Sequence, residues 1–418
     1  MLCVVPYESM MLEMMTLRSS LRNLFRQKAR TAMTLASIVV GVMALIVSGG
    51  FVEDVFIQLR EATIHSRFGH LQIYREGFYA NGVKDPYKYM ITAPEEVQIP
   101  LAAVPGVLDT MMRLNFFGLL NNGKTDLPIV GEGVEADKET KLGSHLVIIA
   151  GRQLKDTDVN GILLGEGVAK SLAIDVESFV TILANTPEGA LNSVEFKVVG
   201  IFRTYAKDFD ARAVRISLPA AQDLLRLQGA HSVVVSLADT LTTDAVAAKL
   251  AADLGRRGFE IKTWLELDDF YAKTVDLYKT QLAVLQFIIL VVVLLSVANS
   301  VNMSAYERVG EFGTLKALGS HDWQISVLII VENVLLGLIG ATLGVVLGVL
   351  LALGLSAIGI PMPPPPNSNV GYTAYIRLVP SVLLVSFAIG FLATVLSSLL
   401  PARAVARVPV VDALRQNV

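Results

Sequence analysis

The most prominent pattern along the chain is a set of long apolar stretches. They cover residues 31–52, 281–303, 324–360 and 378–400. Each is long enough to cross the ~30 Å hydrocarbon core of a bilayer as a helix. The stretch at 324–360 exceeds one crossing and must tilt, break or protrude. We therefore expect an α-helical membrane protein with four transmembrane helices.

The region between the first two spans, residues 53–280, has a different pattern and contains no run that could cross a membrane. Alternating apolar and polar positions predict strands at 70–75, 113–120, 127–133, 179–184, 194–203, 213–218 and 231–237. Helical spacing occurs at 96–103, 167–172, 220–227 and 243–257. It also continues through 53–64 and 265–280, which predicts helical stalks beside the spans. We expect a large extracytoplasmic α+β domain inserted between the first and second spans.

The basic residues in the short segments predict the orientation. Residues 1–30 form a basic amphipathic arm, and we expect cytoplasmic anchors at Arg22, Arg26 and Arg30, with Arg403 in the tail 401–418. The loop 304–323 also carries basic residues, whereas the proline-rich loop 361–377 has only Arg377. Because Lys and Arg gather in cytoplasmic loops, both termini should be cytoplasmic and the large domain should lie outside.

The composition agrees with this mixture of membrane spans and a water-facing domain. Hydrophobic residues make up 53% of the chain and charged residues 17%, against about 25% charged in soluble proteins. The net charge of −3 gives no argument for a nucleic-acid partner, and we expect none. The single cysteine, Cys3, excludes an internal disulfide.

Two segments resemble nucleotide-binding motifs. Residues 118–125, GLLNNGKT, match the phosphate-loop pattern letter for letter, but a strand pattern follows where that loop needs a helix. Asn-Asn-Gly is typical of a hairpin turn, and we predict a hairpin. Residues 131–136, GEGVEA, resemble a dinucleotide fingerprint, but we expect them to lack its strand-to-helix setting. The histidines have no metal-site spacing. We therefore expect no catalytic residue, cofactor or metal in this chain.

The loop 304–323 is the strongest candidate for a functional segment. It is short, of mixed charge and helical in part. A short amphipathic helix lying parallel to the membrane could dock into a cytoplasmic partner, but an ordinary connecting loop would have a similar composition. The residues alone leave both interpretations open.

Three motifs in order resemble those of the MacB/FtsX/LolE-type permeases of ABC transporters. The loop fits the family pattern E-R-x-x-E-(I/F)-G-x-(L/M)-(R/K)-A-L-G, with matches at Glu307, Arg308, Glu311, Gly313, Leu315, Lys316, Ala317, Leu318 and Gly319. The arm RNLFRQKARTAMT at 22–34 and the tail at 400–415 also resemble the family. LLGEGV at 163–168 resembles an element of its periplasmic core domain.

The third span repeats a further family feature. Glu332 precedes Gly337, Gly340, Gly344 and Gly348. Small residues four apart allow close helix packing. An acid within an apolar span is costly, so Glu332 should face protein or water, and a hydrogen bond near the cytoplasmic interface is the simplest interpretation.

The resemblance implies a non-catalytic permease of the bacterial inner membrane that works with a second permease, identical or paralogous. Two copies of a separate ATPase, which carry ATP and Mg²⁺, would bind residues 304–319 as a coupling helix. The outer domain would then extract or release a lipoprotein or other lipophilic substrate to a periplasmic acceptor. The alternatives are efflux of peptides or drugs with an adaptor, and signalling to a periplasmic hydrolase.

Overall fold

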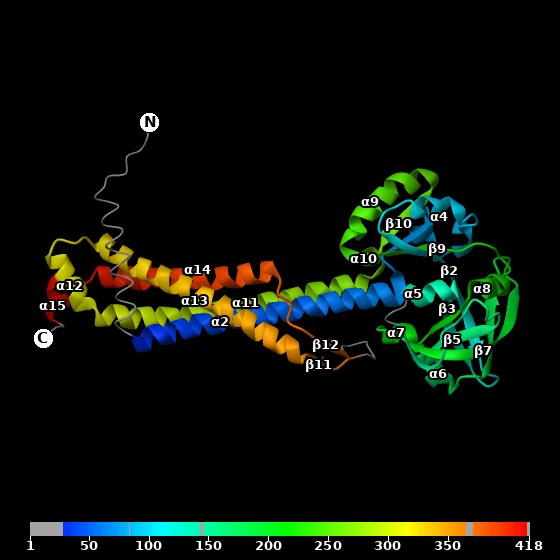
Figure 1. Ribbon diagram of the computed structural model, residues 1–418, viewed down its shortest axis with the longest axis horizontal. Coiled ribbons are helices and arrows are strands. Elements are labelled where there is room, and N and C mark those ends of the chain that lie inside the picture. The colour runs from blue at the N-terminus through cyan, green and yellow to red at the C-terminus, as the bar shows by residue number, and fades with distance from the viewer. Residues whose placement is uncertain (1–27, 83, 143–145, 365–370, 416–418) are drawn as a thin grey trace. The chain divides into compact units, whose positions relative to one another are not determined.

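The computed structural model describes residues 28–415 apart from 83, 143–145 and 365–370 (Figure 1). Arg22 and Arg26 lie outside the described residues, as does the side chain of Arg30. The chain forms two compact units. The helical unit comprises Met1–Phe56, Val275–Ile360 and Thr373–Val418, and the core domain comprises Ile57–Thr274 and Pro361–Tyr372.

The helical unit is built from α2 (Lys28–Thr63), α11 (Asp269–Glu307), α13 (Asp322–Ile358) and α14 (Pro380–Ala406). Within the described residues these are the four helices long and apolar enough to span a membrane, which confirms the predicted number. At ~1.5 Å per residue, the 27 residues of α14 extend for about 40 Å. The 36 residues of α2 and 39 residues of α11 exceed one crossing, and both helices continue into the core domain.

Four glycines let α13 pack closely against its neighbours. An added Cβ would lie within 3.0 Å of a side chain of α2 at three of them: Gly340 beside Ile38, Gly344 beside Val42 and Gly348 beside Ile46. At Gly337 it would lie 3.1 Å from Thr394 of α14. The glycines therefore allow branched side chains of the neighbouring helices to approach the α13 backbone.

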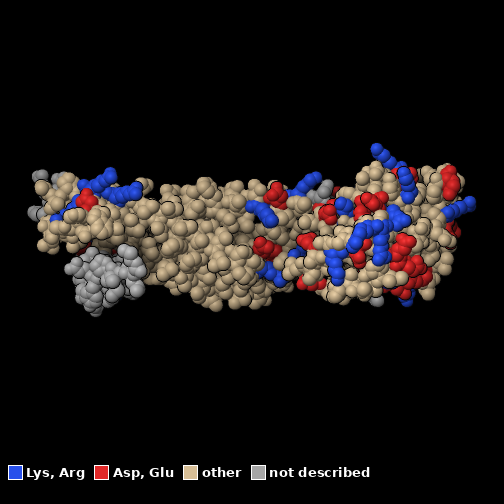
Figure 2. Space-filling model, turned by 90° about the horizontal axis from the view of Figure 1, so that it is seen from above, with Lys and Arg blue, Asp and Glu red and all other residues tan. Residues whose placement is uncertain are grey.

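The outer surface of the helical unit is apolar around its middle. Figure 2 shows a wide band there without Lys, Arg, Asp or Glu, and charged residues gather at the end that carries α12 (Val309–Ala317). On α11, Phe287 and Leu295 are more than 60% exposed. Such a surface suits hydrocarbon or another apolar helix rather than water.

The core domain contains a ten-stranded mixed sheet in the order β10-β1-β9-β2-β3-β8-β5-β7-β4, with β6 pairing to β2 and β7. The strands are β1 (Leu71–Arg75), β2 (Val107–Asn121), β3 (Asp126–Val134), β4 (Val147–Gly151), β5 (Gly161–Gly165), β6 (Phe179–Asn185), β7 (Leu191–Arg203), β8 (Ala213–Ser217), β9 (Ser232–Leu237) and β10 (Phe259–Thr263). Two further short strands, β11 (Ile360–Met362) and β12 (Tyr372–Ala374), pair with each other. The two-stranded sheet has only edges, where Pro361 is tolerated.

Short helices connect and cover these strands. They are η1 (Ile64–Phe68), α3 (Phe78–Asn81), η2 (Pro86–Tyr89), α4 (Glu95–Ala102), α5 (Ala136–Leu142), α6 (Glu166–Leu172), α7 (Lys207–Asp210), α8 (Leu218–Leu225), η3 (Thr240–Thr242), α9 (Thr243–Leu254), η4 (Gly255–Arg257) and α10 (Trp264–Leu267). The mixed α+β prediction is confirmed, and every predicted strand is present. The sequence interpretation missed β4, β5 and β10, as well as the short strands β11 and β12.

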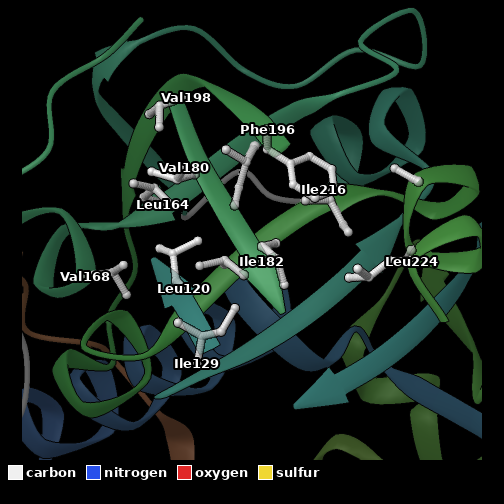
Figure 3. Packing of buried hydrophobic residues seen from close by; sticks show 14 of the residues in the cluster. Leu120, Ile129, Leu164, Val168, Val180, Ile182, Phe196, Val198, Ile216 and Leu224 are labelled. Atoms are coloured by element: carbon white, nitrogen blue, oxygen red, sulfur yellow. The ribbon is translucent and has the colours of Figure 1, made fainter. Parts of the chain in front are cut away.

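The core domain has two main clusters of buried apolar side chains. One gathers Leu120, Ile182, Phe196 and Ile216 of the sheet with residues of α6 and α8 such as Leu224 (Figure 3). The other packs β1 and β9 against α4 and α9. Burial of these side chains supplies the main driving force for folding of the domain.

The two nucleotide-motif look-alikes have structural roles. Residues 118–125 form the predicted β2–β3 hairpin, with Asn121 opposite Asp126. The expectation that 131–136 lacks a strand-to-helix setting is wrong, because α5 follows β3 directly. Gly131 and Gly133 nevertheless lie inside β3. A Cβ added to Gly131 would lie 2.0 Å from Phe116, and one added to Gly133 would lie 2.3 Å from Ala221. They make room for packing and do not form a phosphate-binding turn.

Candidate functional site

The loop motif of the sequence, residues 307–319, falls on α12 and its two ends. α11 ends at Glu307, and α12 begins after one break at Arg308, whose backbone has φ −104° and ψ 13°. The expected helix over 304–319 is therefore shorter than predicted. Val309 and Phe312 of α12 are buried, whereas Leu315 and Leu318 are exposed, the latter by 81%.

Arg308 joins the start of α12 to the first third of α13. Its Nη1 lies 2.8 Å from Oε2 of Glu332, and its Nε lies 3.1 Å from Oε2 of Glu311. The guanidinium also lies over the ring of Phe312, 5.1 Å from the ring centre. The side chains of Arg308 and Glu332 are each 12% exposed. Glu332 thus has a cationic partner within the protein, which offsets the cost of an acid in an apolar helix.

Lys316 anchors the other end of α12. Its Nζ donates to the carbonyl oxygen of Val408 at 3.0 Å and lies 2.8 Å from Oδ1 of Asp322. Val408 precedes α15 (Val410–Arg415), and Asp322 is the first residue of α13. Because the Lys316 side chain is only 11% exposed, these contacts fix the end of α12 to two other helices. Arg403 is exposed on α14 and does not join them.

Gly319 ends α12 in a left-handed turn. Its φ is +99°, a conformation that glycine adopts without strain. The amide of Ser320 donates to Leu315 O at 3.0 Å, and the amide of Gly319 donates to Lys316 O at 2.9 Å. These bonds satisfy carbonyls at the end of the helix. The turn leaves Leu318 pointing away from the buried face.

The structure shows a second anchor in the helical unit that the sequence did not reveal. Asp54 of α2 is fully buried, and its Oδ1 lies 2.7 Å from Nε of Arg377. Its Oδ2 accepts from the amide of Tyr375 at 2.9 Å. The amide of Arg377 donates to Gly50 O at 3.1 Å, and a Cβ on Gly50 would lie 2.5 Å from Arg377 O. Arg377 therefore fixes the segment before α14 to α2.

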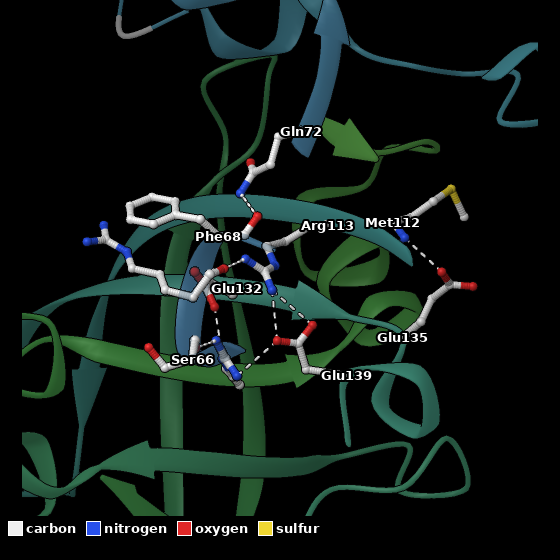
Figure 4. Close-up of polar contacts among 10 residues, drawn as sticks. Ser66, Phe68, Gln72, Met112, Arg113, Glu132, Glu135 and Glu139 are labelled. Carbon is white, nitrogen blue, oxygen red and sulfur yellow. Dashed lines mark hydrogen bonds and ion pairs between the residues drawn. The ribbon is translucent and has the colours of Figure 1, made fainter. Parts of the chain in front are cut away.

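In the core domain, buried arginines hold the end of α2. The helix finishes in η1, a π-helical turn. Arg113 of β2 donates to the carbonyl of Arg67, and Arg215 of β8 donates to that of Ser66 at 3.3 Å (Figure 4). Gln72 donates to Phe68 O at 2.9 Å. Cations at the C-terminal end of a helix interact favourably with its dipole as well as with its free carbonyls.

Two glutamates compensate these arginines. Arg113 makes two bonds to Glu139, at 2.7 and 2.9 Å, and Nε of Arg215 lies 2.8 Å from Glu132. Burial alone would raise the pKa of Glu132, but Arg215 and Arg113 hold it below its ordinary value. We call Arg113, Glu132, Glu139 and Arg215 the arginine clamp. The signal for it in the sequence is a charged residue at an inward position of a strand, as in Glu132 and Arg215.

The family-like element LLGEGV forms the junction of β5 and α6. Its Glu166 is 7% exposed at the side chain and makes two bonds of 2.7 Å to Arg203 of β7. The bonds from Arg203 lower the pKa of Glu166 to about 2. This glutamate therefore has a structural role. Among the residues that the structure describes, no cluster of His, Cys, Asp or Glu has the arrangement of a metal site.

Comparison with known families fits this architecture. The model of the MacB-like periplasmic core domain matches residues 31–253, more than half of the chain, and that of the FtsX-like permease C-terminal region matches residues 283–410. The chain belongs to the FtsX-like permeases with a MacB-like periplasmic core domain. This confirms the resemblance seen in the sequence and identifies the α12 segment as part of a permease.

Individual relatives have low sequence identity to this chain but align with it over more than half of its length. The chain is 28% identical to an uncharacterized ABC transporter permease of Methanocaldococcus jannaschii, over 66% of this chain and 68% of that protein. It is 26% identical to the lipoprotein-releasing system transmembrane protein LolC of Xylella fastidiosa, over 57% of this chain and 59% of LolC. It is 26% identical to the macrolide export ATP-binding/permease protein MacB of Hyphomonas neptunium, over 96% of this chain and 60% of MacB. The chain thus spans about 60% of the length of MacB and LolC.

Proposed function

We propose that this chain is the permease subunit of an ABC transporter and that α12 receives a separate ATPase subunit. The observation that carries the proposal is the two-sided character of α12. One face is buried through Phe312 and fixed by Arg308 and Lys316, and the other presents Leu315 and Leu318 to solvent. An exposed apolar face on a firmly held helix is suited to receive a partner's groove. Two ATPase copies, with ATP and Mg²⁺, would serve a pair of permeases.

The contacts of α12 provide a route for movement. A displacement of α12 would act on α13 through Arg308 and Glu332, and on the segment between α14 and α15 through Lys316 and Val408. α11 runs to within one residue of α12 and, like α2, continues into the core domain. Because the end of α2 is held by the arginine clamp, movement of this helix would reach the sheet. We infer that the core domain does the mechanical work.

The proposal includes an arrangement in the membrane and a set of partners. Both termini and α12 would lie in the cytoplasm of a bacterial inner membrane, and the core domain in the periplasm. The exposed apolar face of α11 would meet lipid or the second permease, identical or paralogous. Similarity to LolC favours release of a lipoprotein to a periplasmic acceptor. Similarity to MacB over 96% of the chain favours export with an adaptor as the second candidate.

Co-purification in detergent with a co-expressed candidate ATPase tests the docking site. We expect Leu318→Glu and Leu315→Glu to reduce the retained ATPase at least tenfold, because each places a charge in an apolar contact. Leu241→Glu is a matched control, since Leu241 is 79% exposed in the core domain. If all three variants retain as much ATPase as the wild-type chain does, α12 does not contact the ATPase.

The two substrate classes need a separate measurement. Spheroplasts that contain the wild-type complex are incubated with a purified periplasmic lipoprotein carrier, and released lipoprotein is quantified. Lipoprotein release by wild type that is lost in Leu318→Glu would support lipoprotein transport. If wild type releases no lipoprotein but confers a resistance to macrolides that Leu318→Glu abolishes, export is supported instead.

A further inference from the structure

The core domain contains a pocket of about 350 Å³ that has no role in the contacts described above. It lies where α2 ends and is lined by Arg67 and Phe68 of η1, by Tyr205 and Ala206, and by Phe209 and Arg212 around α7. Asp268, the residue before α11, also lines it. The volume falls at the lower end of the range of roughly 300–1,000 Å³ that is usual for small-molecule sites.

Arg67 is held in this pocket in a way that leaves its donors unused. Its guanidinium lies 4.6 Å from the ring centre of Phe68 and 4.7 Å from that of Phe209. Aromatic rings interact with the faces of a guanidinium, whereas its five N–H groups point outward in its plane. Among the described residues, the Arg67 side chain has no hydrogen bond or ion pair.

The Arg67 side chain is half-buried, so part of its hydration is removed. The group remains a cation at neutral pH, because a guanidinium does not lose its proton in proteins. The position of Arg67 is nevertheless well defined, because its carbonyl accepts from Arg113 of the arginine clamp. The charge of Arg67 is therefore fixed in position, while its N–H donors have no hydrogen-bond acceptor among the described residues.

Arg212 adds a second cation to the same pocket. Its backbone is fixed, since its amide donates to Phe209 O at 3.0 Å and its carbonyl accepts from Val130 at 2.9 Å. Its side chain is exposed and has no hydrogen bond or ion pair with another described residue. Two acids, Asp208 and Asp268, line the pocket as well, and both have contacts within the chain, such as the bond that Asp268 accepts from the amide of Tyr271 at 3.2 Å. The charged side chains of the pocket that have no hydrogen bond or ion pair with a described residue are thus Arg67 and Arg212, beside apolar rings.

We propose that this pocket binds a small organic anion, namely a phosphate or carboxylate group that carries a short apolar substituent. The anion accepts hydrogen bonds from Arg67 and Arg212, because the planar pairs of N–H donors of a guanidinium are well suited to phosphate and carboxylate. The substituent packs against Phe209 and Tyr205. A bound molecule contacts both the end of α2 and the residue that precedes α11. Occupancy therefore stabilises one arrangement of these two helix ends. Binding needs no ATPase, so the proposal stands or falls independently of the function proposed for α12.

Equilibrium dialysis of the full chain in nonionic detergent, with protein-free micelles as the blank, tests this site. The probes are ³²P-labelled butyl phosphate, ³²P-labelled inorganic phosphate and ¹⁴C-labelled butanol. We expect saturable binding of butyl phosphate and none of butanol. Arg67→Gln and Arg212→Gln should each weaken binding at least tenfold. Arg257→Gln, on an exposed part of η4, is the matched control and should bind as wild type does.

Ala206→Phe provides a variant that keeps both cations but fills the pocket, and it should abolish binding. Tighter binding of butyl phosphate than of inorganic phosphate identifies a lipid-like or other organic monoester as the ligand class. Equal binding of the two would overturn the apolar substituent and leave free phosphate as the ligand. The proposal is overturned if neither phosphate binds saturably, or if Arg67→Gln, Arg212→Gln and Ala206→Phe all bind as wild type does.

Discussion

At the scale of single residues, charged side chains in apolar surroundings determine how α12 is held. Arg308 contacts Glu332, Glu311 and the ring of Phe312 at once. The two carboxylates differ in exposure, at 12% for Glu332 and 41% for Glu311. Exposed ion pairs contribute little to stability, whereas removal of one partner of a buried pair leaves an uncompensated charge.

Glu332→Gln should therefore destabilise the helical unit much more than Glu311→Gln. We expect a loss of about 2 kcal/mol for the first, reduced from the fully buried case because the pair keeps some exposure, and less than ~0.5 kcal/mol for the second. Thermal or denaturant unfolding in a fixed detergent measures both. The double variant Arg308→Gln/Glu332→Gln should recover part of the loss. Equal effects of the two single substitutions would contradict the assignment of Glu332 as the buried partner.

His70 gives the core domain a defined dependence on pH. Its Nδ1 accepts from the amide of Leu237 at 3.1 Å, so Nε2 carries the proton and faces Thr240 Oγ1 at 3.1 Å. Burial, with a smaller effect from the nearby His65, lowers the pKa of His70 from 6.5 to about 4. Between these values the unfolded chain binds more protons than the folded one. Stability is therefore full above about pH 6.5 and falls as the pH drops toward 4, by up to ~1.4 kcal/mol per pH unit.

His70→Asn tests this dependence, because an amide oxygen can replace Nδ1 as the acceptor but does not titrate. The variant should show a flatter fall in unfolding temperature than wild type between pH 7 and pH 5. An unchanged slope in His70→Asn would assign the pH dependence to other groups, such as His231, whose pKa burial also lowers to about 4.

At the scale of elements, packing of α13 against α2 depends on glycines that leave no room for a side chain. Gly344→Leu should lower stability by about 1–3 kcal/mol, since the new side chain meets Val42, to which even a Cβ would approach within 2.7 Å. Gly354→Leu on the same helix is the matched control, because nothing lies within 4 Å of its added Cβ. Unfolding in detergent measures both variants. Equal stability of the two would show that this face of α13 does not pack against α2.

The elements found from the sequence are those with strong local patterns. Long apolar runs predicted the membrane helices, and alternation predicted strands such as β6 and β7. β5 was missed because all of its residues are buried, so GILLG has no alternation. The ion pair between Arg308 and Glu332 was missed because its partners lie 24 residues apart along the chain.

Long-range polar contacts were the least predictable part of the candidate site. The motif residues around α12 were named from a family resemblance, but their partners Val408 and Asp322 were not. The arginine clamp joins residues as far apart as Glu132 and Arg215, separated by 83 positions. Such pairs depend on which strands become neighbours, and that arrangement is a property of the whole sheet.

At the scale of the whole molecule, the membrane arrangement is the prediction on which the function rests most directly. If α12 receives a cytoplasmic ATPase and the core domain works outside, the two must lie on opposite sides of the membrane. Leu318, beside α12, and Leu241, in the core domain, are exposed by 81% and 79%, so cysteines there should be equally reactive when accessible. The sequence contains only Cys3, and Cys3→Ser supplies a cysteine-free background.

A membrane-impermeant maleimide should label Leu241→Cys in intact spheroplasts and Leu318→Cys only in inverted vesicles. Addition of the ATPase to inverted vesicles should then protect Leu318→Cys, because a docked partner covers the exposed face of α12. Labelling of both cysteines from the same side would contradict the proposed topology. Opposite sides without protection would retain the topology but remove α12 as the docking site. The two halves of the proposed function can thus fail separately, since topology depends on the positions of basic loops and docking depends on one apolar helix face.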